Sequence, residues 1–221
     1  MNAIIISDLH IGSKYFLNRA FETFLETIPG DYEIILNGDI IDNTKIKLPL
    51  AHQQILERIE KLSFHQPVSW VHGNHDNGFI PDKVGKIDFR PIYQIGNRLL
   101  IAHGHDFDEI MPRNRLFMRF FKFLHQVRVS LGARPVHVAH YAKKWKAFYK
   151  VLRDNVMKNA VACAMEQGCD SVTCGHTHFP EDRVYNGIRY INTGAWTEYP
   201  PHYLLVTGRK MTLKSIHARR V

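Results

Sequence analysis

The chain is poor in cysteine and has no long apolar run. Its 221 residues include three cysteines, at positions 163, 169 and 174, an odd number without the paired spacing of a zinc site. We therefore expect reduced thiols and a cytoplasmic protein. No apolar stretch approaches the roughly 20 residues that cross a bilayer. The first strand begins at once, without a basic region or cleavage site, so we also expect no signal peptide.

Two common hydrolytic motifs are missing as well. The sequence has no Gly-x-Ser-x-Gly nucleophile elbow and no Walker phosphate loop. It contains no internal repeat and no low-complexity segment. The apolar fraction of 45% and the charged fraction of 23% are typical of a soluble globular protein. The length predicts a single domain over 1–221, and a helical insertion is expected at about 109–168.

Acidic residues are scarce in one part of that insertion. Residues 109–158 contain 12 Lys and Arg but only 2 Asp and Glu, while the rest of the chain contains 17 basic and 19 acidic residues. The net charge of +8 therefore comes entirely from this stretch. Such a surface favours an anionic partner, such as phosphates, acidic lipid or nucleic acid.

Apolar runs and helical patterns alternate in the first half of the chain. Strands are expected at 3–7, 33–37 and 68–72, with helices at 18–28 and 50–62 between them. This order is typical of an α/β fold with parallel strands, whose functional groups collect at the carboxyl ends of the strands. Later strand pairs flank short turns, of which Asn186-Gly187 is the strongest hairpin signal. We expect two packed sheets with helices outside.

The insertion contains two long helical patterns, at 113–131 and 139–167. Leu116, Phe120, Phe123 and Leu124 share one face of the first pattern, and Phe117 and Phe121 widen that face. One interpretation is a plain helical hairpin that caps the sheet. The other is a lid with an apolar groove and a basic rim, suited to an amphiphilic substrate.

Five strand ends carry side chains that can bind a metal ion. They are Asp8-Leu9-His10, Gly38-Asp39, Gly73-Asn74-His75-Asp76, His103-Gly104-His105 and Gly175-His176-Thr177-His178. Oxygen and imidazole ligands without cysteine suit Mn²⁺, Fe²⁺, Mg²⁺ or Zn²⁺. There are too many ligands for one ion, and a carboxylate such as Asp39 can bridge two ions roughly 3.5–4 Å apart. His75 can serve as a general acid, and Asp42 or Asp76 can orient such rings.

As an ordered set, these five motifs resemble those of the calcineurin-like metallophosphoesterase superfamily. The resemblance implies a four-layer α/β/β/α sandwich and two divalent ions, with Mn²⁺ expected. Carried to matching positions, it implies two ligand sets that share Asp39. The first is Asp8, His10, Asp39 and His178, and the second is Asp39, Asn74, His103 and His176.

Within that superfamily the chain is most similar to UDP-2,3-diacylglucosamine diphosphatases. The similarity rests on the helical insertion, the run Asn159-Ala160-Val161 and the late Gly194-Ala195-Trp196. It implies release of UMP from a nucleotide-sugar lipid, in lipid A biosynthesis, with the acyl chains entering the insertion. The implied catalytic residues are His75 and Asp39. The implied substrate contacts are Asn74, His75, Lys146, Lys150 and His176, with Lys143 nearby.

Two positions differ from the best-known branch of those enzymes. That branch has arginine where His75 stands and aspartate where His105 stands. The alternative is therefore a metallophosphodiesterase or nuclease of a sister branch with another phosphoester substrate. The wide apolar face of the insertion argues mildly against nucleic acid. Apolar and basic groups together predict a peripheral position on the inner face of the cell membrane.

Overall fold

The computed structural model describes the backbone of residues 1–113, 115–133, 135–136 and 138–217. Side chains are described at these positions except 112–113, 115–118, 120–122 and 138–139. The apolar face predicted for the first insertion helix depends largely on Leu116, Phe117, Phe120 and Phe121. It therefore lies outside the described side chains.

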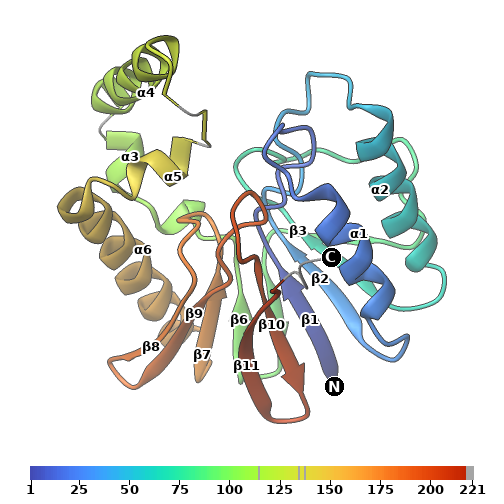
Figure 1. Ribbon diagram of the computed structural model, residues 1–221. Helices are drawn as coiled ribbons and strands as arrows, with labels where there is room; N and C mark the ends of the chain where they lie inside the picture. Colours follow the sequence, from blue (N-terminus) through green and yellow to red (C-terminus); the bar gives the residue numbers. More distant parts are fainter. Residues whose placement is uncertain (114, 134, 137, 218–221) are drawn as a thin grey trace.

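The first sheet has six strands in the order β11-β10-β1-β2-β3-β4 (Figure 1). The strands are β1 (Asn2–Ile6), β2 (Glu33–Asn37), β3 (Val68–Val71), β4 (Asp88–Arg90), β10 (His202–Thr207) and β11 (Lys210–Ser215). β1 to β4 are parallel, and β10 and β11 form an antiparallel hairpin beside β1. The predicted helices between these strands are confirmed as α1 (Asn18–Thr27) and α2 (Leu50–Leu62). The sequence did not predict β4.

The second sheet has five strands in the order β5-β6-β7-β9-β8. The strands are β5 (Tyr93–Ile95), β6 (Leu99–Ile101), β7 (Ser171–Cys174), β8 (Glu181–Tyr185) and β9 (Ile188–Asn192). β6, β7 and β9 are parallel, and the two predicted hairpins add an antiparallel strand at each edge. At Asn186-Gly187 both residues have positive φ, as a type I′ turn requires.

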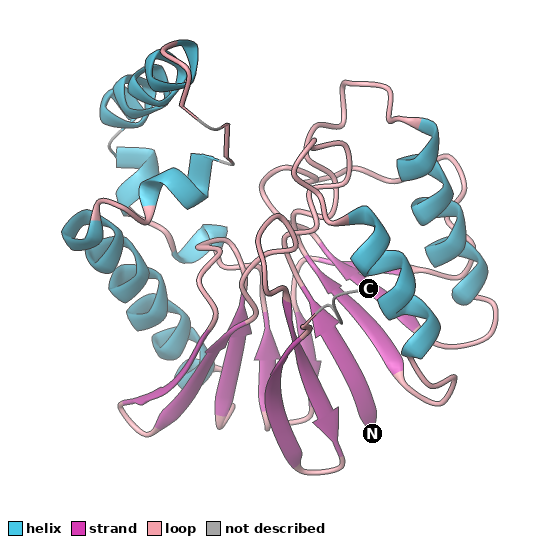
Figure 2. Cartoon of the chain, viewed as in Figure 1, coloured by secondary structure: helices cyan, strands magenta, loops and turns pink. Residues whose placement is uncertain are grey.

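Strand periodicity explains why the sheets form inner layers. In β1, Ala3 and Ile5 pack between the sheets, against Leu99 and Ile191 among others, while Ile4 packs toward α1 and α2. A third apolar cluster joins the second sheet to α6 (Lys146–Glu166). Both sheets are therefore covered by helices on their outer faces, as Figure 2 shows, and the predicted α/β/β/α layering is confirmed.

The insertion contains α3 (Ile110–Arg113), α4 (Arg115–Ser130), α5 (Val138–Ala142) and α6, after a short 3-10 turn at His105–Phe107. Figure 1 shows α3, α4 and α5 beyond the amino-terminal end of α6. The prediction of one continuous helix over 139–167 is wrong, because the chain turns at 143–145. The Lys143 ammonium there donates to the His178 carbonyl, 2.7 Å away. No glycine or proline marks this break.

Candidate metal centre

The predicted ligands gather at one edge of the two sheets. β1, β2 and β3 run parallel to one another, as do β6 and β7, so the loops that follow them meet at their carboxyl ends (Figure 2). Backbone hydrogen bonds join these loops. The Asp8 N–H donates to the Gly38 carbonyl and the His10 N–H donates to the Asp39 carbonyl, both at 3.0 Å. The loops therefore form a rigid base for the side chains.

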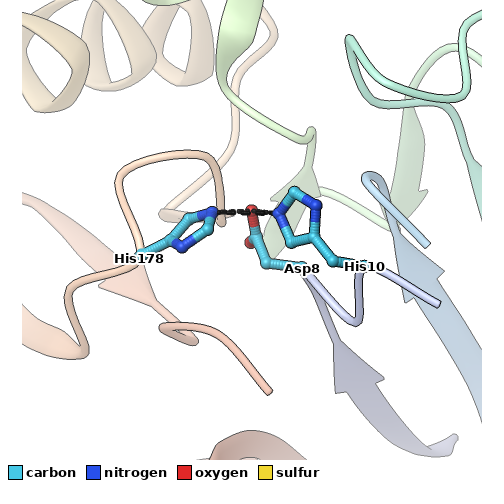
Figure 3. A group of neighbouring side chains, drawn as sticks. All are labelled: Asp8, His10 and His178. Carbon is cyan, nitrogen blue, oxygen red and sulfur yellow. Dashed lines mark hydrogen bonds and ion pairs between the residues drawn. The ribbon is translucent and has the colours of Figure 1, made fainter. Parts of the chain in front are cut away.

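The first group of side chains is Asp8, His10 and His178 (Figure 3). All three are buried. His178 Nε2 lies 3.1 Å from Asp8 Oδ1 and 3.1 Å from His10 Nε2. His10 Nε2 is 4.0 Å from the same carboxylate oxygen. Both rings thus aim a nitrogen at the Asp8 carboxylate, so one ion could contact all three side chains.

The second group is centred on Asp39. Its Oδ2 lies 3.3 Å from His103 Nε2, and 3.9 Å from both His10 Nε2 and His75 Nε2. Two further sets of possible ligands meet here, His10 with Asp39 and His75, and Asp8 with Asp39 and His103. Within each set the ligand atoms lie within 4.8 Å of one another. Asp39 therefore belongs to two of the three sets of possible ligands, a position that a bridging carboxylate would require.

In His10, His103 and His75, the Nε2 atom faces the carboxylates and the Nδ1 atom lies beside a hydrogen-bond acceptor. His10 Nδ1 lies 3.0 Å from Asp42 Oδ1, His103 Nδ1 lies 2.9 Å from the Asn37 carbonyl, and His75 Nδ1 lies 2.6 Å from the Asp42 carbonyl. Such contacts select the tautomer whose other nitrogen can bind a metal. His103 Nε2 is buried and has no hydrogen-bond partner among the described residues. A lone pair there would face the Asp39 carboxylate, so a cation fits between them.

The electrostatics of the site also favour a cation. Burial raises the pKa of Asp39, but His103 and His10 outweigh burial and bring that pKa well below its ordinary value. Burial likewise lowers the pKa of His103, yet Asp39 and Asp8 together raise it to about 10. Positive charge is therefore stabilised between these side chains. The donor set of carboxylates and imidazoles fits divalent ions such as Mn²⁺.

Other predicted residues lie outside the three groups. Asn74 is exposed in the loop after β3. His176 Nε2 lies 2.9 Å from Asp108 Oδ2, a partner that the sequence reasoning missed because the two residues are far apart in the chain. On α6, Lys150 pairs with Asp154 at 3.2 Å and Lys146 is exposed.

Two carboxylates considered as ring-orienting groups behave differently. Asp42 takes that position at His10. Asp76 is fully buried, and its oxygens instead accept the N–H groups of Gly73 and Ile40, both at 2.6 Å. It therefore ties the loop after β3 to the loop after β2. His105 lies beside the site, with its ring centroid 5.5 Å from that of His103.

Several known proteins have sequences related to this chain. The DNA polymerase II small subunit of Methanocaldococcus jannaschii is 22% identical in an alignment that covers 87% of this chain but 38% of that protein. The chain thus spans about two fifths of the length of that relative. A UDP-2,3-diacylglucosamine hydrolase of Shewanella loihica is 25% identical, and the match covers 96% of both chains.

A structural comparison gives the same fold. Vps29 of Entamoeba histolytica, solved as a single mutant, superposes with a TM-score of 0.50 at 14% identity, and the match covers 98% of both chains. The model of the calcineurin-like phosphoesterase superfamily domain matches residues 1–211. Nearly the whole chain is included, with all five strand ends that carry the candidate ligands. The protein therefore belongs to the calcineurin-like phosphoesterase superfamily.

Proposed function

We propose that this chain is a two-metal phosphoester and pyrophosphate hydrolase whose substrate is UDP-2,3-diacylglucosamine. The products would be UMP and 2,3-diacylglucosamine 1-phosphate, within lipid A biosynthesis. The observation that carries the chemistry is the position of the buried Asp39 in two overlapping sets of possible metal ligands. The substrate is supported by relatives named UDP-2,3-diacylglucosamine hydrolase, one of which matches along 96% of both chains.

The proposed ligand sets share Asp39 and follow the pattern of the superfamily. One ion would be held by Asp8, His10, Asp39 and His178. The second would be held by Asp39, Asn74, His103 and His176. Support comes from superfamily membership, which implies divalent metal binding, and from the clustering of five of these seven side chains in the groups described above. We propose Mn²⁺ as the ion, with Fe²⁺, Zn²⁺ and Mg²⁺ as substitutes that the same ligands accept.

The reaction would cleave one P–O bond of the pyrophosphate by attack of water. Two divalent ions at such a site supply hydroxide near neutral pH and neutralise the phosphoryl oxygens. His75 is exposed, with Nδ1 held by the Asp42 carbonyl. Its Nε2 points toward Asp39, so a protonated His75 would donate from Nε2 to the leaving oxygen. The His75 backbone N–H fixes Asp39 by donating to its Oδ1 at 2.8 Å.

We propose that residues 1–221 form one domain. Its helical insertion, at about 109–168, would bind the acyl chains of the substrate. Phe123 and Val127 on α4 and Leu131 just after it are 58%, 39% and 82% exposed, and they follow one another at four-residue intervals. An exposed apolar stripe beside many basic residues supports an amphiphilic substrate and a peripheral membrane position. Within the described part of the chain, no helix combines the length and the apolarity required to cross a membrane.

The direct test is release of UMP from UDP-2,3-diacylglucosamine with MnCl₂. Wild-type protein is expected to release UMP, and an Asp39→Ala variant is expected to lose that release because both ligand sets lose a member. Full activity of the variant would remove the two-metal mechanism. Bis-p-nitrophenyl phosphate serves as a generic diester. Turnover of the diester alone would keep the metal centre and discard the lipid substrate.

A nuclease or phosphodiesterase is the second candidate function. It is favoured by the relatives named DNA polymerase II small subunit and by the basic residues of the insertion. Nucleic acid bound there would be released steeply by added salt, because its binding displaces condensed counterions. Cleavage of DNA or RNA with Mn²⁺, without release of UMP from the lipid, would establish this alternative.

A further inference from the structure

Asp108 connects the start of the insertion to His176. Its Oδ2 lies 2.9 Å from His176 Nε2, and its Oδ1 accepts the backbone N–H groups of Ile110 and Met111, both at 2.9 Å. The Asp108 and His176 side chains are 1% and 7% exposed. The Asp108 carboxylate is therefore buried and fully engaged, with one oxygen at the beginning of α3 and the other at the imidazole.

Helix α6 holds the backbone on both sides of Asp108. The Asn159 amide donates to the Phe107 carbonyl at 2.9 Å, and the Glu109 N–H donates to Asn155 Oδ1 at 3.0 Å. Asn155 and Asn159 are four residues apart and lie on the same face of α6. Because α6 packs on β7 and β9, these two side chains fix Asp108 relative to the second sheet.

His176 is held from a second direction by its backbone. Its N–H donates to the Asp8 carboxylate, at 3.1 Å and 3.2 Å to the two oxygens. Its ring lies edge-on to that of His103, with centroids 5.6 Å apart. A carboxylate can only accept, so Nε2 carries the hydrogen and the lone pair of a neutral ring is on Nδ1.

We propose that Asp108 is a positioning residue that holds His176 as its Nε2–H tautomer, so that Nδ1 is the nitrogen offered to the second divalent ion. This inference rests on the proposed function, because it takes His176 as a ligand. It assigns a role to a residue outside the five ligand-bearing motifs. It also means that the insertion and the metal centre share one carboxylate.

Asparagine at position 108 reverses the hydrogen bonding. The N–H groups of Ile110 and Met111 still require the amide oxygen, so the amide nitrogen of an Asp108→Asn variant would face His176 Nε2. That donor favours the tautomer with hydrogen on Nδ1, which blocks the nitrogen offered to the ion. Asp108→Ser is the second variant, since serine can still cap α3 but is too short to reach His176.

The first measurement is the tautomer of His176 in metal-free protein with ¹⁵N-labelled histidine. Long-range ¹H–¹⁵N spectra at about pH 8, above the ordinary histidine pKa, distinguish the two ring nitrogens. A His176→Gln variant identifies the signal. We expect the Nε2–H pattern in the wild type and its loss in Asp108→Asn and Asp108→Ser. An Nδ1–H pattern in the wild type would overturn the proposal.

The second measurement is calorimetric titration with MnCl₂. We expect two ions per wild-type chain and one site weakened about 10- to 100-fold in both Asp108 variants, the usual cost of losing such a partner. Asp106→Asn is the matched control, because Asp106 lies in the same loop and is 83% exposed. Equal affinities in wild type and both variants would overturn the positioning role. Fewer than two ions in the wild type would instead count against the proposed function, while the tautomer would still be measured.

Discussion

At the scale of single residues, the site depends on backbone conformations that side chains usually avoid. Among the described residues, six that are not glycine have positive φ, and five of them are the proposed ligands Asp8, His10, Asp39, His176 and His178. Their φ angles lie between 51° and 61°. Such conformations cost on the order of 1–3 kcal/mol each and cluster at functional sites. The hydrogen bonds between the loops oppose this strain and aim the side chains at one another.

Gly175 shows how closely the loops approach. A Cβ atom there would lie 2.1 Å from Asp8 Oδ2 and 2.5 Å from Ser7 Oγ. We expect Gly175→Ala to displace the Asp8 carboxylate, to lower the free energy of unfolding by about 1–3 kcal/mol, as overpacking does, and to weaken Mn²⁺ binding. Urea unfolding and calorimetry measure the two effects.

Gly30 provides the matched control for that substitution. A Cβ atom at Gly30 would meet only Gln66 Oε1, at 4.0 Å. The Gly30→Ala variant should keep the stability and the Mn²⁺ affinity of the wild type. An equal loss of stability in both variants would mean that the contact with Asp8 is not the cause.

At the scale of elements, Glu198 ties the insertion to the loop that follows β9. Its Oε2 lies 2.8 Å from His140 Nδ1 on α5 and 2.8 Å from Lys143 Nζ in the turn before α6. Lys143 also holds the His178 carbonyl. One carboxylate thus connects α5 and the turn to the backbone beside a proposed ligand.

The contribution of these Glu198 contacts to stability should depend on pH. Burial raises the pKa of Glu198, but Lys143 and His140 outweigh burial and bring that pKa below the ordinary 4.5. A lowered pKa stabilises the folded state above pH 4.5, and that contribution is lost as the pH falls through the folded-state pKa. The difference in unfolding free energy between wild type and Glu198→Gln should therefore shrink below pH 4.5, as urea unfolding at several pH values will show.

The control for the pH series is a glutamate that forms no ion pair within the described part of the chain. Glu166 is exposed near the end of α6. We expect the curve for Glu166→Gln to run parallel to that of the wild type across the same range. A difference for Glu198→Gln that does not change with pH would show that its charge contributes nothing to the fold.

At the scale of the whole molecule, the candidate metal centre lies where the two sheets meet. Asp8, His10 and Asp39 follow β1 and β2 of the first sheet, whereas His103 and His178 follow β6 and β7 of the second. Each sheet alone presents an incomplete set of the proposed ligands. Bound ions would therefore stabilise the packing of one sheet on the other, because the unfolded chain does not keep these groups together.

Metal removal tests this connection. We expect MnCl₂ at about 100 times its Kd to raise the free energy of unfolding by about 2.7 kcal/mol for one site, and EDTA to reverse the gain. Thermal unfolding measures both changes. The gain should be much smaller in Asp39→Asn and unchanged in Asp82→Asn, an exposed position. An equal gain in unfolding free energy in the wild type and both variants would show that Mn²⁺ binds at a site that does not include Asp39.

Much of the fold and of the candidate site could be predicted because the signals are local. The helix at Leu50–Leu62 and the Asn186-Gly187 hairpin follow from periodicity and turn chemistry within a few residues. The candidate ligands were found because parallel strands deliver their ends to one edge, whatever the loops between them contain.

Contacts between distant segments could not be predicted in the same way. The break at Lys143 has no glycine or proline and depends on a carbonyl 35 residues further along the chain. In the sequence, nothing distinguishes Asp108 from other loop aspartates. Its contact with His176, 68 residues away, is seen only in the folded protein. The sequence by itself determined the layers and the types of ligand, because hydrophobic periodicity and side-chain chemistry are properties of each segment. Only the tertiary structure decided which nitrogen each histidine presents and which carboxylates orient it, because these depend on distances of about 3 Å between separate loops.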